Sequence, residues 1–497
     1  MPSTEQNLKT LLVTQVLVAA LFGAFLISSV DDNDLTTPAV ATGSTTNSGV
    51  SSAAASLDSV AVPQTPTSQG APAAANAGAA NSTNGTSPAG TGSAPAPALS
   101  GPGASAAPSE ASSGANPFGE APAFDARTTL GVTDDVLRIG TLVSQTGAIN
   151  FRSSAQATKA YIDKVNEQGG VHGRKIELLL RDDGLDPNRG QQAVEEMLNA
   201  GIFSFVAFNA PLTEGSMNPV LAKNDINMIG SFAMNTDELS YRFGAGYQNF
   251  GKVGGTRLCE AGITTPGLVY ISNQNEDLDA NIYESWRRGA EQCGLTITDD
   301  NLHPVDVTKA DFTDVVTSLQ FSGVDGIGTV LDATAMVRFQ QALNRQGFVP
   351  FHAALPFGSD EAVLQDPNVG TSFVGMEVLS DVNFPGTFGM VEYEAEVRRR
   401  FGDAAEINWA GAQGWTSAML FVETVRRTGP DLTRERFRWY LDRIEGFDTD
   451  MMAPHTFGEQ IDLHSPNGCL KVGLVQADRT VREVQGFTCV SDDLTRF

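Results

Sequence analysis

The chain has 497 residues and a formal net charge of −26, with 58 Asp and Glu against 32 Lys and Arg. This acidic balance argues against a nucleic-acid partner, because phosphate contacts need clustered Lys and Arg. The simpler interpretation is an acidic, soluble surface. The length would allow two or three domains, but the composition indicates that a long N-terminal segment belongs to none of them.

The first distinctive segment is Leu11–Val30, twenty residues without a charge. At 1.5 Å per residue it is long enough to cross the roughly 30 Å core of a bilayer. Lys9 precedes it and Asp31 and two further aspartates follow, which favours a short cytoplasmic end at residues 1–10 and an extracytoplasmic body. A cleaved signal peptide is the alternative. Both interpretations predict that the rest of the chain is exported.

Residues 31–128 are predicted to form a disordered tether rich in Ala, Ser, Pro, Gly and Thr. Between Thr37 and Asn116 there is no aromatic residue, no Lys or Arg, and only two leucines. Such a segment buries too little apolar surface to offset its conformational entropy. As a flexible coil of roughly 80 residues it would have an r.m.s. reach of about 50 Å.

From residue 134 onward, apolar strands alternate with amphipathic helices. The sequence predicts helices at 153–168 and 336–346, and strands at 136–143, 175–180, 203–208, 227–229, 268–272, 327–332 and 352–355. The strand at 175–180 runs into Asp182 and Asp183, after which Asp186 reads as an N-cap with Pro187 at the first helical position. This alternation predicts an α/β fold with parallel sheets covered on both faces. About 360 residues exceed one comfortable core, so we expect two such units with a ligand cleft between them.

The four cysteines agree with export, since their number is even and all lie in the predicted folded part. Alternating apolar residues around 477–479 predict a hairpin in which a bond between Cys469 and Cys489 is geometrically reasonable. That leaves Cys259 to pair with Cys293. A metal site is the alternative, but no CxxC spacing or nearby histidine pair supports it, so we predict no metal and no cofactor.

Four stretches of the folded part form a further pattern: LRIGTLVSQTGA, KVNEQGGVHGRKIELLLRDDGLDP, LQFSGVDGIGTVLDATAMVRFQQALNRQG and INWAGAQGWTSAMLFVETVRRTG. They resemble the extracytoplasmic solute-binding proteins of the branched-chain amino-acid (Leu/Ile/Val-binding) ABC transporter family, over about residues 134–490. The resemblance implies a type I periplasmic-binding fold, with two doubly wound parallel-sheet lobes. It places lobe 1 at 134–247 plus 382–445 and lobe 2 at 248–381 plus 446–492. The three crossovers between them would form a hinge.

The resemblance also implies where a ligand binds. Hydroxyls and backbone N–H groups of lobe 1 loops would hold an amino-acid carboxylate, and an acidic residue of lobe 2 would hold the ammonium group. The corresponding lobe 1 residues are Gln145, Thr146, Asn209, Ala210, Ser231, Phe232 and Ala233. In lobe 2 they are Asn275, Asp332 and Asp360, the last nearest to the acid that meets the ammonium.

This sequence departs from the family pattern at several of these positions. Expected hydroxyls are replaced by Asn209, Ala210 and Pro211, Met234 stands near an expected Thr, and the aromatic lid expected near Asn275 is missing. These departures weaken the case for a carboxylate-bearing ligand. Helix capping is the alternative role for Asp332 and Asp360. We expect Asp182 and Asp183 to be structural or rim residues, and Trp415 to pack in the core.

Three common motifs of enzymes are missing from the sequence. They are the GxSxG elbow of serine hydrolases, a dinucleotide-binding GxGxxG after a strand, and the zinc-binding HExxH. We therefore predict a non-enzymatic, membrane-tethered solute-binding protein. It would capture a small polar ligand, such as an amino acid or amide, and present it to an ABC permease. A ligand sensor and a cell-surface scaffold are the alternatives. The predicted partners are the ligand, the permease and the membrane.

Overall fold

The computed structural model describes residues 121, 123, 129–147, 149–230, 239–242, 244–272, 276–457 and 468–490. All of them belong to the second of two units into which the chain divides, Ser105–Phe497. The predicted membrane segment 11–30 and all but two residues of the predicted tether 31–128 lie outside the described residues. Within the described part of the chain, no helix combines the length and apolar character needed to span a bilayer.

The first half of this unit is built on a five-stranded sheet in the order β2-β1-β3-β4-β5. All its strand pairs are parallel. The strands are β1 (Val136–Val143), β2 (Lys175–Asp182), β3 (Phe205–Val206), β4 (Met228–Ile229) and β5 (Ser240–Tyr241). The helices of this half are α2 (Arg152–Glu167), α3 (Pro187–Asn199), α4 (Pro211–Glu214), α5 (Met217–Asn224), α11 (Phe388–Phe401), α12 (Trp409–Thr428) and α13 (Arg434–Leu441). We call these elements lobe 1.

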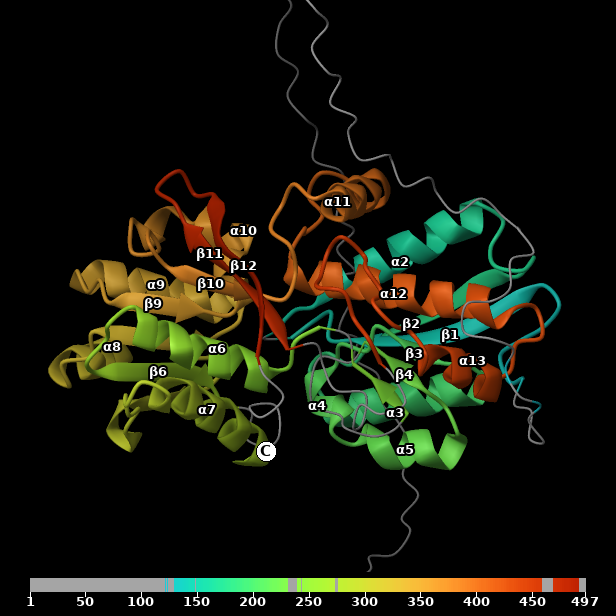
Figure 1. Cartoon of the computed structure of the whole chain (residues 1–497), viewed down its shortest axis with the longest axis horizontal. Coiled ribbons are helices and arrows are strands. Elements are labelled where there is room, and N and C mark those ends of the chain that lie inside the picture. The colour runs from blue at the N-terminus through green and yellow to red at the C-terminus, as the bar shows by residue number, and fades with distance from the viewer. Residues whose placement is uncertain are drawn as a thin grey trace, which may run out of the picture. The chain divides into compact units, whose positions relative to one another are not determined.

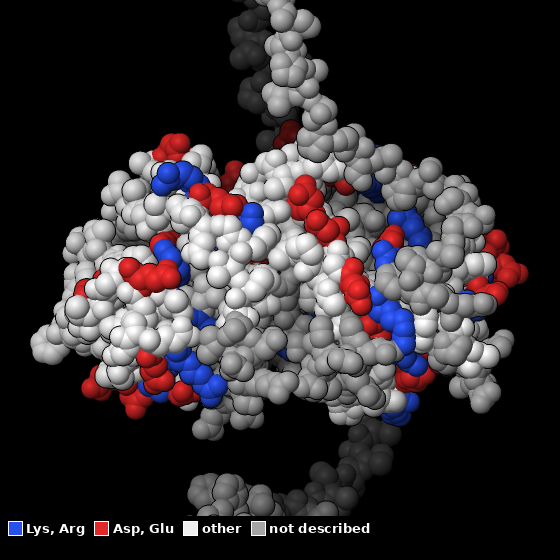
Figure 2. All heavy atoms as spheres, viewed as in Figure 1, with Lys and Arg blue, Asp and Glu red and all other residues white. Residues whose placement is uncertain are grey.

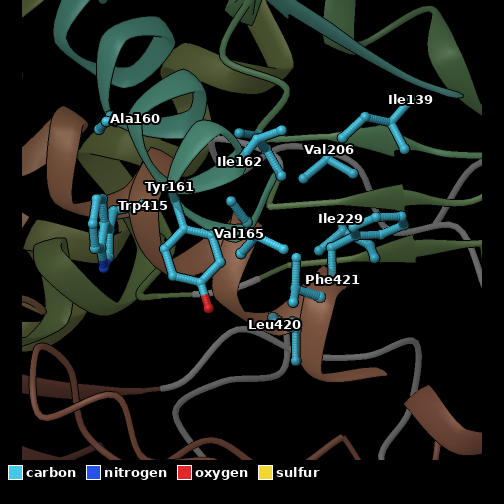
Figure 3. Close-up of a cluster of buried hydrophobic side chains, with 14 of the residues drawn as sticks. Ile139, Ala160, Tyr161, Ile162, Val165, Val206, Ile229, Trp415, Leu420 and Phe421 are labelled. Carbon is cyan, nitrogen blue, oxygen red and sulfur yellow. The ribbon is translucent and has the colours of Figure 1, made fainter. Parts of the chain in front are cut away.

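Lobe 1 owes its main core to α2 and α12, which are distant in sequence but pack together on the sheet. Figure 3 shows their side chains facing residues of β1, β3 and β4, among them Ile139, Val206 and Ile229. The rings of Tyr161 on α2 and Trp415 on α12 meet edge to face, with centroids 4.9 Å apart. Trp415 is fully buried, so the structure places it in the core, as predicted.

The other half is built on a seven-stranded sheet in the order β12-β11-β10-β9-β8-β6-β7. Its strands are β6 (Pro266–Ile271), β7 (Leu302–Val305), β8 (Gly326–Val330), β9 (Phe351–Ala354), β10 (Glu377–Ser380), β11 (Cys469–Val475) and β12 (Val481–Cys489). Its helices are α6 (Tyr247–Glu260), α7 (Glu276–Glu291), η1 (Asp299–Asn301), α8 (Thr313–Phe321), α9 (Ala333–Gln346), η2 (Pro356–Ser359), α10 (Glu361–Leu364) and η3 (Pro367–Val369). Strands β6 to β10 pair in parallel, and β11 runs antiparallel to β10 and β12. We call these elements lobe 2 (Figure 1).

Helices cover both faces of the lobe 2 sheet, as the side chains of β6 show, because successive residues pack against different helices. Val269 and Ile271 belong to a buried cluster with side chains of α8 and α9. Leu268 and Tyr270 belong to a second cluster, with side chains of α6 and α7. Because successive strand residues point to opposite faces, these clusters lie on opposite sides of the sheet. The predicted parallel sheets with helices on both faces are therefore confirmed here.

Both predicted disulfides are present. Cys259 at the end of α6 pairs with Cys293, which follows α7, and so links these two helices. Cys469 and Cys489 are opposite each other in the β11–β12 hairpin and form the second bond. The hairpin predicted from the alternation around residues 477–479 is confirmed by the same pairing.

Candidate functional site

The two aspartates at the end of β2 bind neighbouring loops of lobe 1. Asp183 is fully buried and accepts hydrogen bonds from Ser144 Oγ at 2.6 Å and Thr213 Oγ1 at 2.9 Å. Asp182 accepts two hydrogen bonds from Thr146, one from the hydroxyl at 2.6 Å and one from the backbone N–H at 3.2 Å. Together they join the loop after β1, the loop after β2 and α4. The structural role that we predicted for these carboxylates is confirmed.

The predicted lobe 1 ligand residues that the structure describes lie around these loops. The Gln145 N–H, like that of Thr146, donates to the Asp182 carboxylate. Asn209 is buried and its side-chain amide donates to Ser154 Oγ. Ala210 is buried in a hydrophobic cluster with residues of α3 and α5. Contact of these residues with a ligand stays a prediction, as it does for Ser231, Phe232, Ala233 and Asn275, which lie outside the described residues.

A pocket of about 440 Å³ lies between the two lobes. Lobe 1 contributes the turn before α2 and the loop that joins α11 to α12. Lobe 2 contributes the start of α9, η2 and the start of α10. The lining carries five carboxyl groups and no Lys or Arg; the acids are Asp332, Asp360, Glu361, Asp403 and Glu406.

Asp332 uses its two carboxylate oxygens differently. Oδ1 accepts the N–H groups of Thr334 at 2.7 Å and Ala335 at 3.2 Å, and so caps α9. Oδ2 is buried without a hydrogen-bond partner, and the residue lines the pocket with only 7% of its surface exposed. Burial raises the pKa of Asp332, although the two N–H groups and the charge of Arg338 oppose the rise. Capping is thus observed, and the second oxygen is left for another group.

Asp360 is half-buried at the start of α10 and forms no side-chain cap. Burial, and then the negative charges of Glu406 and Asp332, raise its pKa to about 7. The carboxyl group is therefore poised between its protonated and ionised forms near neutral pH. A cation placed between these acids would favour the ionised form, because opposite charges lower the pKa of a carboxyl group.

A small apolar cavity of about 30 Å³ adjoins the acidic pocket. The two share Ile149, Asp332 and Phe357 in their linings. Its other walls are apolar or aromatic: Phe151, Tyr247, Ile271, Ile282, Val330, Leu331 and Leu355. The rings of Phe151 from lobe 1 and Phe357 from lobe 2 meet here, with centroids 6.3 Å apart. The site thus combines an acidic outer part with a small apolar inner part, and Asp332 lies where they meet.

Beside the site, Asp381 joins segments that connect the lobes. It follows β10 and is buried, and its Oδ2 accepts the N–H of Ala245 at 2.8 Å and the amide of Gln413 at 3.2 Å. Its Oδ1 accepts the indole N–H of Trp409. Burial raises the pKa of Asp381 to about 6, against the opposing effect of these hydrogen bonds. Ala245 belongs to the segment between β5 and α6, so one carboxylate ties two of the chain's passages between the lobes.

A larger cavity of about 570 Å³ is lined from lobe 1 and the residues that lead into β1, with no contribution from lobe 2. Arg174 in its wall is already bonded to the carbonyl groups of Thr133 and Pro430. We favour the interlobe pocket as the ligand site, because there two lobes and an unsatisfied buried carboxylate oxygen converge.

Sequence reasoning found Asp332 and Asp360 but missed Glu361, Asp403 and Glu406. Glu361 directly follows Asp360 in the sequence, and this adjacency could have indicated it. Asp403 and Glu406 lie in the loop between α11 and α12, more than forty positions further along the chain. The acidic, alanine-rich sequence GDAAE is the only local signal, and it is equally typical of a surface loop.

Comparison with known proteins agrees with this architecture. The chain is 31% identical over 101 residues to the Leu/Ile/Val-binding protein BraC3 of Rhizobium johnstonii, a match that covers 19% of this chain and 26% of that relative. The fatty acid ABC transporter substrate-binding protein of Thermomonospora curvata has a similar structure, with a TM-score of 0.66 and 19% identity, over 75% of this chain and 96% of that one. A leucine-binding protein LivK of Thermotoga maritima is also similar in structure, with a TM-score of 0.59 and 14% identity. The similarity covers 72% of this chain and 99% of that one. At such identities the two structures bear on the fold alone.

The family comparison is broader. The model of the family described as periplasmic binding protein matches residues 136–480, more than half of the chain. Members of this family are substrate-binding proteins of ABC transporters, not enzymes, and their folded part is extracytoplasmic. The predictions of a type I periplasmic-binding fold and of a non-enzymatic chain are thereby confirmed. The chain belongs to the periplasmic binding protein family.

Proposed function

We propose that the protein is a membrane-tethered solute-binding protein that captures a small ligand between its lobes and presents it to an ABC importer. The observation that carries this proposal is the interlobe pocket of about 440 Å³, to which both lobes contribute polar side chains. A pocket of this size falls in the range typical of small-molecule sites. The family supports a role in solute binding.

The connection between the lobes supports capture by closure. Asp381 accepts a hydrogen bond from the segment before α6. Two residues further along the chain, the N–H of Asn383 donates to the carbonyl oxygen of Met451, in the segment after α13, at 2.6 Å. Closure of two lobes about a few connecting residues is a common way to enclose a ligand. The two faces of the pocket would then approach each other around the solute.

The tether completes the proposal. Its composition predicts a flexible coil with a reach of about 50 Å, and the apolar segment before it is long enough to span a bilayer. The folded part would remain near a membrane importer while it samples the space around it. Import, rather than sensing, is the role we propose, because members of the family are substrate-binding proteins of ABC transporters.

Thermal unfolding of the full chain, purified oxidised in detergent, tests the proposal against a panel of amino acids, amides, amines and aromatic and aliphatic acids. A ligand at 100 times its dissociation constant stabilises the folded state by about 2.7 kcal/mol, a rise of a few degrees in Tm. We expect at least one class of small solute to produce this rise. A folded chain that no class stabilises would contradict solute binding and favour a scaffold role.

A further inference from the structure

We propose that the interlobe pocket selects ligands that carry a positive charge and no carboxylate, such as an alkylamine with a short apolar end. This inference rests on the proposed solute-binding function and names its ligand class. The inference depends on three features of the pocket: its charge balance, one unsatisfied buried oxygen, and the lack of a Lys or Arg in its lining that would hold an anion.

The first feature is local charge. On the face shown in Figure 2, Lys and Arg side chains are interspersed with Asp and Glu side chains. The pocket differs, because its five carboxyl groups, from Asp332 to Glu406, have no Lys or Arg beside them in the lining. Among the residues that the structure describes, none of these five side chains forms an ion pair with Lys or Arg. Apart from the charge of Arg338, which acts on Asp332 from outside the lining, the charge of the pocket is therefore left for a ligand to balance.

The second feature is the Oδ2 atom of Asp332. The residue is 7% exposed, and this oxygen has no hydrogen-bond donor although the oxygen beside it has two. A buried carboxylate oxygen without a donor is costly, so a bound donor stabilises it. An ammonium group supplies charge and three N–H donors at once. Because Asp332 lies at the junction of both cavities, the cation would sit there, with its carbon chain directed into the apolar part.

The third feature concerns anions. Three long helices, α2, α9 and α12, have N-termini that reach the pocket, and a side chain beside each accepts an N–H of its first turn. For α2, whose N-cap Phe151 offers no side-chain cap, Asn150 Oδ1 accepts the Arg152 N–H at 2.7 Å. Asp332 bonds the first free N–H groups of α9, and Asn408 Oδ1 accepts the Gly411 N–H of α12 at 3.1 Å. Between residues 129 and 490, the segments outside the described residues contain no Lys or Arg that could supply a counter-charge. A ligand carboxylate would thus meet five acidic groups in a lining that carries no Lys or Arg; Arg338, whose charge acts on Asp332, lies outside that lining.

The small apolar cavity limits the rest of the ligand. Its volume of about 30 Å³ is room for one or two water-sized groups, and its walls are aromatic and aliphatic. One or two methyl groups at the end of a branched alkyl group fit such a space, whereas a long acyl chain does not. The pocket therefore favours a compact amine over a fatty acid.

Three ligands with the same isobutyl end test the charge rule directly by isothermal titration calorimetry on the full chain. They are 3-methylbutylamine, leucine and 4-methylpentanoate, which carry an ammonium group, both charged groups, and a carboxylate respectively. We expect the amine to bind at least tenfold more tightly than either carboxylate-bearing ligand. If leucine or 4-methylpentanoate binds more tightly than the amine, the inference is overturned while solute binding stands. If no ligand class binds the folded chain, the proposed function fails and the inference with it.

Two variants test the assigned residues. Asp332→Asn keeps the α9 cap, because Asn caps helices as well as Asp does, but it removes the charge. We expect amine affinity to fall at least tenfold, the loss typical of one charge-assisted hydrogen bond. Asp186→Asn is the matched control, since Asp186 caps α3 through the same two N–H positions and lies outside the pocket lining. Equal effects of the two substitutions would overturn the assignment.

The pH dependence of binding provides a readout that a purely structural role would not change. The pKa of Asp360 is about 7 without ligand, under the influence of Glu406 and Asp332, and a bound cation lowers it. Affinity for 3-methylbutylamine should then rise about tenfold from pH 6 to pH 8, as the carboxyl group loses its proton. In Asp360→Asn this rise should disappear. An affinity that falls over this pH range would contradict a cationic ligand.

Discussion

The carboxyl group of Asp381 should make the stability of the protein depend on pH in a specific window. Its pKa is about 6 in the folded chain, against an ordinary value of 3.8. The native state therefore binds this proton more tightly than the unfolded chain does. Its contribution to the free energy of unfolding is greatest below pH 4, is lost as pH rises to about 6, and stays constant above that. A shift of about two pKa units corresponds to about 3 kcal/mol.

Asp381→Asn removes this titration and isolates the effect. We expect the difference in unfolding free energy between wild type and variant to be about 2 kcal/mol more favourable to the wild type at pH 4 than at pH 7. Urea unfolding of the oxidised full chain at several pH values, followed by tryptophan fluorescence, measures it. A difference that is the same at both pH values would refute the reasoning.

A second substitution tests the role of the hydrogen bonds. Trp409→Phe removes the indole N–H that the carboxylate of Asp381 accepts. A hydrogen bond to a charged group contributes about 1.5–3 kcal/mol. Loss of the indole N–H should therefore raise the pKa of Asp381 by at least about one unit. The window in which stability falls should then extend to about pH 7. No extension of the window would mean that the indole does not stabilise the ionised form.

Three further predictions concern the framework around the site, each measured by urea unfolding at pH 7.5. The double variant Cys259→Ser/Cys293→Ser releases a loop of 34 residues and should cost about 4 kcal/mol, whereas no loss would show that the unfolded chain is not constrained by this bond. Gly328→Ala would place a methyl group 2.4 Å from the ring of Trp286 and should cost about 1–3 kcal/mol; a neutral change would mean that β8 and α7 separate freely. Asp183→Ala leaves the buried hydroxyls of two lobe 1 loops without their acceptor and should cost about 3 kcal/mol, and a stable variant would contradict its structural role.

Local sequence was sufficient for much of the framework. The strand predicted at 136–143 is β1 over the same residues, because a mostly apolar run between polar turns is typical of a buried parallel strand. Asp186 caps α3 as its position before Pro187 indicates, through bonds to Asn188 N and Arg189 N. Strands β3 and β4 are shorter than predicted, with two residues each, because apolar residues beside them are buried in loops rather than in the sheet.

The lobe boundaries remain predictions from the resemblance. Met451, Met452 and Phe457 belong to the buried cluster of lobe 1, so the chain after α13 still packs on that lobe at these positions. The following segment, 458–467, lies outside the described residues.

The sequence by itself determined the α/β class, both disulfides and two of the acids in the pocket. These features depend on composition, on periodicity or on a motif within a few dozen residues. Only the tertiary structure decided that Asp332 and Asp360 share a pocket with Asp403 and Glu406 and that the lining of this pocket carries no Lys or Arg. Charge balance in a pocket is a sum over loops from both lobes, and the distances that govern it arise only when the sheets and helices pack.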